Sequence, residues 1–188
     1  MAQAKTLKQS ELDHVLEYVS KRKYPLRDRA IILTSFLSGL RVGEIAALHI
    51  SDVVADDGSI KTEIRLRAEQ TKGAHPRTVF VSSRLREALA TYHASRAKTA
   101  PDLPFFHTSN RSGFSANGLC VWFKSLYDRV GISGGSSHSG RKFFITTLAN
   151  KGIGVRILAS LAGHRSIAVT QRYIDVNDEQ KRNAVELI

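Results

Sequence analysis

Six side chains spread along the 188 residues carry functional groups that together could attack a phosphodiester. In chain order they are Arg41, Lys72, His138, Arg141, His164 and Tyr173. Two guanidiniums can each grip a phosphate through paired N–H donors, two imidazoles can move or share protons, a lysine can protonate a departing oxygen, and a phenol can be the nucleophile. Each residue type is common, so the prediction depends on their order and on the residues that flank them.

Taken one at a time, the two arginines have simpler explanations. Arg41 stands three residues before Glu44, a spacing at which a helical ion pair contributes only about 0.2–0.5 kcal/mol. Arg141 is followed by Lys142 and could be an ordinary surface residue. In a catalytic role, each guanidinium would instead donate to non-bridging phosphate oxygens and stabilise the charge of a pentavalent transition state, a geometry that lysine cannot supply.

The other candidates also allow a structural interpretation. A tyrosine such as Tyr173 most often packs against a helix, and with an ordinary pKa near 10 it needs a base or a strongly cationic site before it can attack. His138 precedes a predicted helix start three residues before Arg141, so both side chains can face the same side, although a lone histidine there is usually a cap. His164 follows a glycine at a helix end, and Lys72 lies in a turn where a lysine is ordinarily just solvated.

Apolar residues recur at helical spacing over most of the chain, and capping residues mark where several helices begin and end. Ser10 is expected to cap a first helix that stops before Pro25, and Gly39 is expected to end the second helix. Further helices are predicted over residues 40–48, from Ser82 or Ser83 onward, from Ser115 to about Gly131, and over residues 140–150, 155–162 and 167–173.

Two segments alternate between apolar and polar residues, which is the period of a half-buried strand. Residues 60–66 and 78–81 predict a hairpin with Lys72 at its tip, and Phe105 with Phe106 predicts a short third strand. The predicted fold class is therefore mainly α, within the α+β class: a helical domain with a small three-stranded antiparallel sheet.

Composition limits the kinds of protein that the chain can be. Hydrophobic residues make up 42% of the sequence, which predicts one well-packed domain over residues 1–188. A net charge of +11 favours a polyanionic partner, nucleic acid above all, over a merely soluble basic protein. A single cysteine, Cys120, and the lack of any long apolar run lead us to expect a cytoplasmic protein, and the histidines show no metal-ligand spacing.

Five sequence blocks occur together in this chain, and their combination is far more specific than any one of them. They are Ser38–Glu44, Thr71–Gly73, His138 with Arg141, Leu161–His164 and Gln171–Asp175. In order and spacing they resemble the catalytic domain of the tyrosine recombinases, the phage integrase family of site-specific DNA recombinases. The resemblance runs nearly from end to end.

The resemblance implies how a phosphate would be held. Arg41 and Arg141 would straddle the scissile phosphate, with Glu44 orienting Arg41 from behind. His164 would steady a phosphate oxygen, although the sequence does not separate its role from that of His138.

The resemblance also implies which groups would move protons and contact DNA. Tyr173 would be the nucleophile, His138 would assist its proton transfer, and Lys72 would protonate the leaving 5′-hydroxyl. His75 and Arg77 would contact the DNA backbone rather than take part in catalysis.

The implied reaction is transesterification through a 3′-phosphotyrosine intermediate, with no metal or other cofactor. Double-stranded DNA is the expected partner, and the protein is expected to act as a dimer or tetramer on it. No N-terminal DNA-binding domain of the kind common in the family is expected within the chain. Lys142, where the family often has histidine, is assigned to DNA contact, and Gly140 stands where the family often has an aliphatic residue.

Two alternative functions use the same residue types. A type IB topoisomerase would relax supercoils without exchanging strands, and a regulator with this fold would bind DNA without cleaving it. The tail over residues 176–188 ends in an apolar patch that could pack on its own core or dock into a neighbouring protomer.

Overall fold

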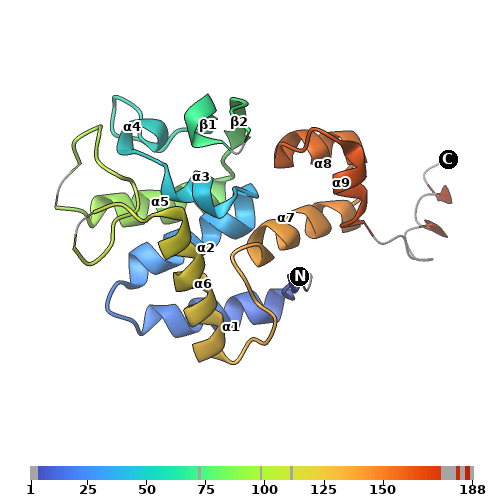
Figure 1. Ribbon diagram of the computed structural model, residues 1–188, viewed down its shortest axis with the longest axis horizontal. Coiled ribbons are helices and arrows are strands. Elements are labelled where there is room, and N and C mark those ends of the chain that lie inside the picture. Colours follow the sequence, from blue (N-terminus) through green and yellow to red (C-terminus); the bar gives the residue numbers. More distant parts are fainter. Residues whose placement is uncertain are drawn as a thin grey trace.

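The computed structural model describes residues 4–174, apart from residues 72, 98 and 111, together with residues 181, 182, 185 and 186. Short and medium-length helices make up most of the fold, and a small two-stranded sheet lies at one edge of it (Figure 1). The helices are α1 (Gln9–Ser20), α2 (Pro25–Ser38), α3 (Val42–Ala46), α4 (Ile50–Val53), α5 (Ser83–Ala94), α6 (Ala116–Val130), α7 (Ser139–Asn150), α8 (Val155–Ala162) and α9 (Ile167–Gln171), with the 3-10 helix η1 (Ala68–Gln70) between the strands. No described helix is both long and apolar enough to cross a membrane.

Helix α2 is the centre of the fold and packs against α1, α3, α5 and α7. Its apolar residues, such as Ile31 and Leu33, are completely buried. Pro25 is suited to the first position of the helix because its missing N–H would have no partner there. Gly39 ends the helix in the left-handed conformation with a φ of 63°, and a Cβ at this position would lie 2.6 Å from the ring of Phe144 on α7.

Most helix ends follow the capping residues that the sequence predicts. The hydroxyl of Ser115 accepts the N–H of Gly118 at 3.0 Å at the start of α6, and Gly131 ends that helix in the left-handed conformation. Helix α1 differs, because its N-cap is Lys8 rather than Ser10. The Glu11 carboxylate accepts the Lys8 N–H at 2.8 Å, so the helix is capped from inside its own first turn.

The predicted helix over residues 40–48 is also shorter than expected. Arg41 is extended, with φ of −72° and ψ of 151°, and only Val42–Ala46 forms helix α3. The single turn of α4 follows over Ile50–Val53, an element that the pattern of the sequence did not indicate.

The sheet consists of β1 (Glu63–Leu66) and β2 (Arg77–Phe80), which pair antiparallel with Ile64 opposite Val79 in the described part of the chain. The prediction of a third strand at Phe105 and Phe106 is wrong. Both rings are buried against Tyr92. The backbone of Phe105 bonds to the Leu48 carbonyl at 2.7 Å and to the Arg96 guanidinium, which leaves it unavailable to the sheet.

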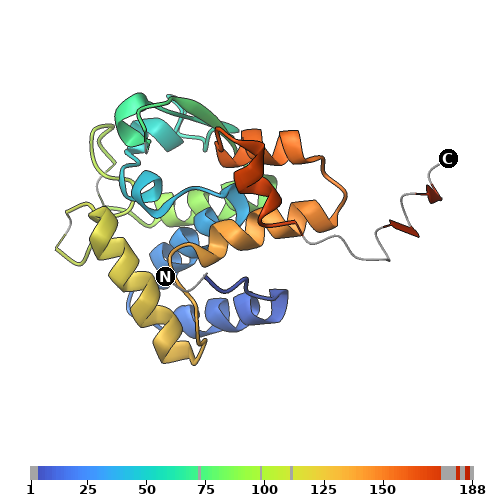
Figure 2. The same cartoon turned by 45° about the vertical axis from the view of Figure 1, so that its right-hand side comes forward.

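The C-terminal helices lead the chain back to the sheet. Helix α7 packs against α2 and is followed by α8, which lies beside β2 and contacts α9 (Figure 2). The close approach of α7 to α2 depends on Gly140, where a Cβ would lie 2.2 Å from the Ser35 hydroxyl and 2.8 Å from the Phe36 ring. Residues 175–180 and most of the rest of the tail lie outside the described residues, so the two alternatives for the tail stay predictions.

Candidate active site

Arg41 is held at the N-terminus of α3 by the carboxylate of Glu44. Its backbone N–H donates to Glu44 Oε2 at 2.7 Å and its Nη1 donates to Glu44 Oε1 at 3.0 Å. Its Nη2 donates to the carbonyl of Gly163 at 3.3 Å, 122 residues away along the chain. The ion pair with Glu44 that the sequence offers as the simpler explanation thus exists, and it orients the guanidinium toward the end of α8.

Glu44 is itself almost completely buried, with 1% of its side chain exposed, and it also accepts a hydrogen bond from Arg77 Nη2 at 2.7 Å. Burial by itself raises the pKa of this carboxyl. The hydrogen bonds and charges of Arg77 and Arg41 outweigh that effect, so the pKa is lower than its ordinary value. A buried carboxylate shared by two guanidiniums fixes both of them in place.

Three arginines meet at the C-terminal end of α8. Arg77 Nη1 donates to the carbonyl of Leu161 at 3.0 Å, Arg141 Nη2 donates to the carbonyl of Ala162, and Arg41 Nη2 reaches Gly163. The last carbonyls of a helix have no partner within the helix and form the negative end of its dipole, so cations are stabilised there. We call Arg41, Arg77 and Arg141 the arginine cluster.

Gly163 allows this arrangement in two ways. Its φ of 63° ends α8 in the left-handed conformation, which a residue with a Cβ adopts only at a cost. A Cβ at this position would also lie 2.6 Å from Cδ of Arg77. The glycine before His164 therefore makes room for the arginine cluster.

Arg141 is the most buried member of the cluster, with 4% of the residue exposed. Its Nη1 donates to the carbonyl of Gly39 at 2.6 Å, which ties α7 to the end of α2. The pKa of Arg141 is lowered to about 9, chiefly by burial and then by the charges of Arg41 and Arg77, while Glu44 and Tyr173 act in the opposite direction. The guanidinium stays charged at neutral pH, and the Tyr173 phenol is close enough to influence it.

His164 joins the nucleophile candidate to the arginine cluster. Its ring stacks on that of Tyr173 with centroids 5.9 Å apart and an interplanar angle of 19°. Desolvation first, and then the charges of Arg141, Arg41 and Arg77 in that order, together lower the pKa of His164 to about 4. The imidazole is therefore neutral at pH 7 and can offer one N–H donor.

Tyr173 is positioned by the turn that follows α9. Its backbone N–H donates to the carbonyl of Thr170 at 2.9 Å, and its carbonyl accepts from Thr146 Oγ1 of α7 at 3.4 Å. The structure thus brings together Arg41, Arg141, His164 and Tyr173, which the sequence scatters over more than 130 positions.

Three further predicted site residues, His138, His75 and Lys72, are not members of the arginine cluster. His138 is exposed at the N-cap of α7, one turn before Arg141. His75 is exposed in the loop between the strands, where its carbonyl accepts from the Thr71 hydroxyl at 2.8 Å. Lys72 lies outside the described residues, so its role stays a prediction.

Two of the residues assigned to DNA contact have internal partners. The side chain of Arg77 is only 11% exposed, and its two terminal nitrogens bond to Glu44 and Leu161. Lys142 is half-buried and its Nζ donates to the carbonyl of Ala4 at 3.1 Å. Sequence reasoning missed the link between Arg77 and Glu44, because nothing local indicates a contact across 33 positions.

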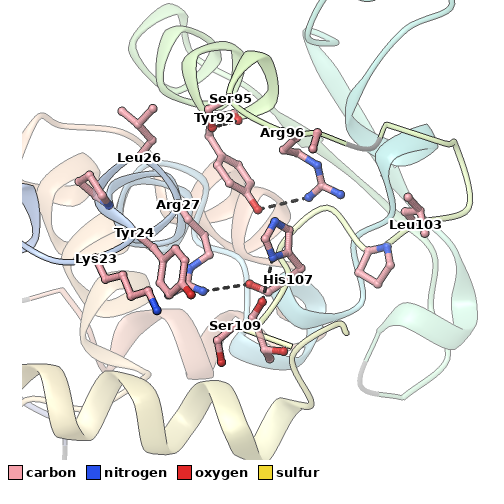
Figure 3. A pocket seen from close by; sticks show the side chains of 14 residues that line it. Lys23, Tyr24, Leu26, Arg27, Tyr92, Ser95, Arg96, Leu103, His107 and Ser109 are labelled. Carbon is pink, nitrogen blue, oxygen red and sulfur yellow. Dashed lines mark hydrogen bonds between the residues drawn. The ribbon is translucent and has the colours of Figure 1, made fainter. Parts of the chain in front are cut away.

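A separate cavity of about 600 Å³ is lined by none of the residues of the arginine cluster (Figure 3). Tyr24 and Arg27 at the start of α2, Tyr92 and Arg96 near the end of α5, and the loop around His107 line it. The Arg27 guanidinium stacks on Tyr24 at 4.3 Å, and its Nη1 donates to the carbonyl of His107 at 3.1 Å. None of the predicted catalytic residues lines this cavity, so we assign the chemistry to the arginine cluster.

The arrangement around the arginine cluster can bind and activate a phosphodiester. Two guanidiniums bind one carboxylate and the third, that of Arg141, binds backbone carbonyls, which leaves an excess of positive charge beside a neutral imidazole and a phenol. Donors held in place before an anion arrives can stabilise charge that develops in a transition state without reorganising. A phenol beside such a site is a reasonable nucleophile, because the phenolate it must form is stabilised by the same charges.

Comparison with known proteins gives concordant results. Residues 5–180 match the model of the phage integrase family. The chain is 30% identical over 184 residues to the tyrosine recombinase XerA of Pyrococcus furiosus, covering 97% of this chain and 61% of that protein. Curated relatives of this kind are longer, and the chain spans about half to three-fifths of their length.

Solved structures show the same fold. A crystal structure of XerA recombinase superposes with a TM-score of 0.77 at 26% identity, covering 100% of this chain and 64% of that one. The Tn1549 transposon integrase, solved with circular intermediate DNA, gives a TM-score of 0.76 at 18% identity, covering 99% of this chain and 67% of that one. At that identity the second likeness supports the fold alone.

Proposed function

The chain belongs to the phage integrase family, and we propose that it cleaves and rejoins double-stranded DNA at specific sites as the catalytic part of a tyrosine recombinase. The observation that carries this proposal is the stacking of Tyr173 on His164 beside the arginine cluster. A non-catalytic DNA-binding protein would not need a phenol next to a neutral imidazole and three fixed guanidiniums.

In the proposed reaction, Arg41 and Arg141 hold the non-bridging oxygens of the scissile phosphate. The Tyr173 oxygen attacks phosphorus, a 3′-phosphotyrosyl bond forms, and the bond to the 5′-oxygen breaks. His138 takes up the phenol proton and Lys72 supplies a proton to the leaving 5′-hydroxyl. The 5′-hydroxyl of another strand then attacks the phosphotyrosyl bond, which re-forms a DNA phosphodiester and releases Tyr173. No external energy is needed, because the covalent intermediate keeps the energy of the broken phosphodiester.

The partner proposed is double-stranded DNA, on which the protein assembles as a dimer or tetramer. The net charge of +11 supports binding to a polyanion, and the names of the curated relatives describe recombinases. Strand exchange between two duplexes needs several active sites, which is why we propose an oligomer on the DNA.

The test begins with DNA that the protein itself selects. Duplexes from a randomised pool are enriched for binding, and the enriched sequence is rebuilt as a nicked suicide substrate from which the short 5′-hydroxyl strand diffuses away. We expect the wild-type chain to form an adduct that survives a denaturing gel and Tyr173→Phe to bind the same DNA without forming it.

Other results would favour the alternatives. Relaxation of supercoiled plasmids that lack the selected sequence would favour a topoisomerase. Tight binding with no adduct from the wild-type chain would favour a regulator and refute the proposed reaction.

A further inference from the structure

Thr170 lies between the two residues that meet in the proposed active site, although nothing in the sequence distinguishes it. It is completely buried on α9, six residues after His164 and three before Tyr173. Its Oγ1 lies 2.8 Å from Nδ1 of His164, and its carbonyl accepts the N–H of Tyr173 at 2.9 Å. One residue therefore contacts both the imidazole and the backbone of the nucleophile.

We propose that the hydroxyl of Thr170 donates its proton to Nδ1 of His164 and thereby keeps the ring proton on Nε2, the nitrogen left to donate to a phosphate oxygen. This inference rests on the proposed function, and it makes Thr170 a positioning residue of the same site.

The direction of the hydrogen bond follows from what each group can offer. A threonine hydroxyl has one proton to donate, and a buried donor without an acceptor costs free energy. Within the part of the chain that the structure describes, Nδ1 of His164 is the only hydrogen-bond partner of this hydroxyl, and full burial keeps water away. If Nδ1 carried a proton, the hydroxyl would have to accept, and its own proton would have no acceptor.

The surroundings of the ring agree with a single proton. Arg141 on α7, Arg41 at the start of α3 and Arg77 on β2 all place positive charge near His164, and the ring of Tyr173 stacks on its face. A doubly protonated imidazole would be repelled by all three guanidiniums. A neutral ring has only one N–H, so the residue that occupies Nδ1 decides which nitrogen can donate.

The consequence for the reaction is a fixed division of roles. With the proton on Nε2, His164 is a neutral donor to the phosphate and not a base for Tyr173. The backbone bond from Tyr173 to Thr170 and the stacking of the two rings hold the phenol and this donor in one unit.

The first experiment needs neither DNA nor activity. The chain is labelled with ¹⁵N-histidine, and the ring nitrogens of His164, identified by their absence in His164→Gln, are observed by NMR at pH 7. We expect Nε2 to be protonated and Nδ1 to be an unprotonated acceptor. A proton on Nδ1 in the wild-type chain would overturn the proposal, and this result does not depend on whether any Thr170 variant folds.

The second experiment uses a matched pair of variants. Thr170→Val keeps the shape of the side chain and removes the hydroxyl, whereas Thr170→Ser keeps the hydroxyl. We expect Thr170→Val to mix the two tautomers and to lower the single-turnover rate of adduct formation about tenfold at unchanged DNA affinity, because the phosphate donor is then only partly available. Thr170→Ser should retain both the tautomer and most of the rate.

The outcomes separate this proposal from the proposed function. Unchanged tautomers and an unchanged rate in Thr170→Val would refute the role of Thr170. A protonated Nε2 in a wild-type chain that never forms an adduct would leave the tautomer assignment standing and refute the recombinase reaction instead.

Discussion

Replacing Arg77 with methionine tests whether the Glu44 carboxylate binds two guanidiniums as a single energetic unit. Methionine keeps much of the apolar stem, which packs beside Gly163, and removes both hydrogen bonds of the guanidinium. The companion change is Glu44→Gln, which keeps the shape of the acceptor and removes its charge. The wild type, the two single variants and the double variant form a double-mutant cycle.

The size of the effect follows from the contacts. A hydrogen bond to a charged group contributes about 1.5–3 kcal/mol, and the neutral bond from Arg77 to the Leu161 carbonyl adds about 0.5–1.5 kcal/mol. Glu44 keeps both of its bonds to Arg41, so the loss stays below that of a buried charge left with no partner. We expect Arg77→Met to lower the free energy of unfolding by about 2–4 kcal/mol, of which about 1.5–3 kcal/mol is coupling to Glu44.

Equilibrium unfolding in urea measures both quantities. With a slope of about 2 kcal/mol per molar urea, the midpoint for Arg77→Met should fall by about 1–2 M. Arg65→Met on β1 is the matched control, because that arginine is exposed and its loss should change stability by less than about 0.5 kcal/mol.

The pH dependence gives an independent check. Arg77 is a main cause of the lowered pKa of Glu44, so part of the stability that Arg77 adds is present above the ordinary pKa of 4.5. That part is lost as the pH falls through the lowered value in the folded protein. The difference in the free energy of unfolding between the wild type and Arg77→Met should therefore become smaller in acid.

Additivity would refute the reasoning. The double variant could lose as much free energy of unfolding as the two single variants together, within about 0.5 kcal/mol. In that case Arg77 and Glu44 do not act together, and their contact adds nothing to the placement of Arg41. If Arg77→Met is as stable as the Arg65→Met control, the buried network is not a source of stability at all.

Two glycines give further predictions. Gly163→Ala should cost about 1–3 kcal/mol more than Gly152→Ala in thermal unfolding, because both have a positive φ but only Gly163 also crowds Arg77, and equal costs would contradict the packing argument. Gly140→Ala should lower stability by about 1–3 kcal/mol through its clash with Ser35, and Ser35→Ala in the same chain should recover part of that loss; no recovery would place the strain elsewhere.

Local signals predicted much of the architecture. Ser115 marks a helix start, and Gly39 and Gly131 mark helix ends, because capping depends on backbone geometry within a few residues. The hairpin was also predicted, as alternation has a period of two in a half-buried strand. Phe105 and Phe106 lack this alternation, and only their aromatic side chains suggested a strand. The chain forms a buried loop there instead.

The sequence by itself determined which chemical groups are available and, through the resemblance of its motifs, which of them to suspect. It could not show that Arg77 turns inward to Glu44 or that Thr170 faces His164. Those contacts join elements or turns whose relative positions depend on how α7, α8 and α9 fold back onto α2 and β2. A hydrogen bond depends on distances of a few tenths of an ångström, and only the packing of the whole chain sets distances to that accuracy.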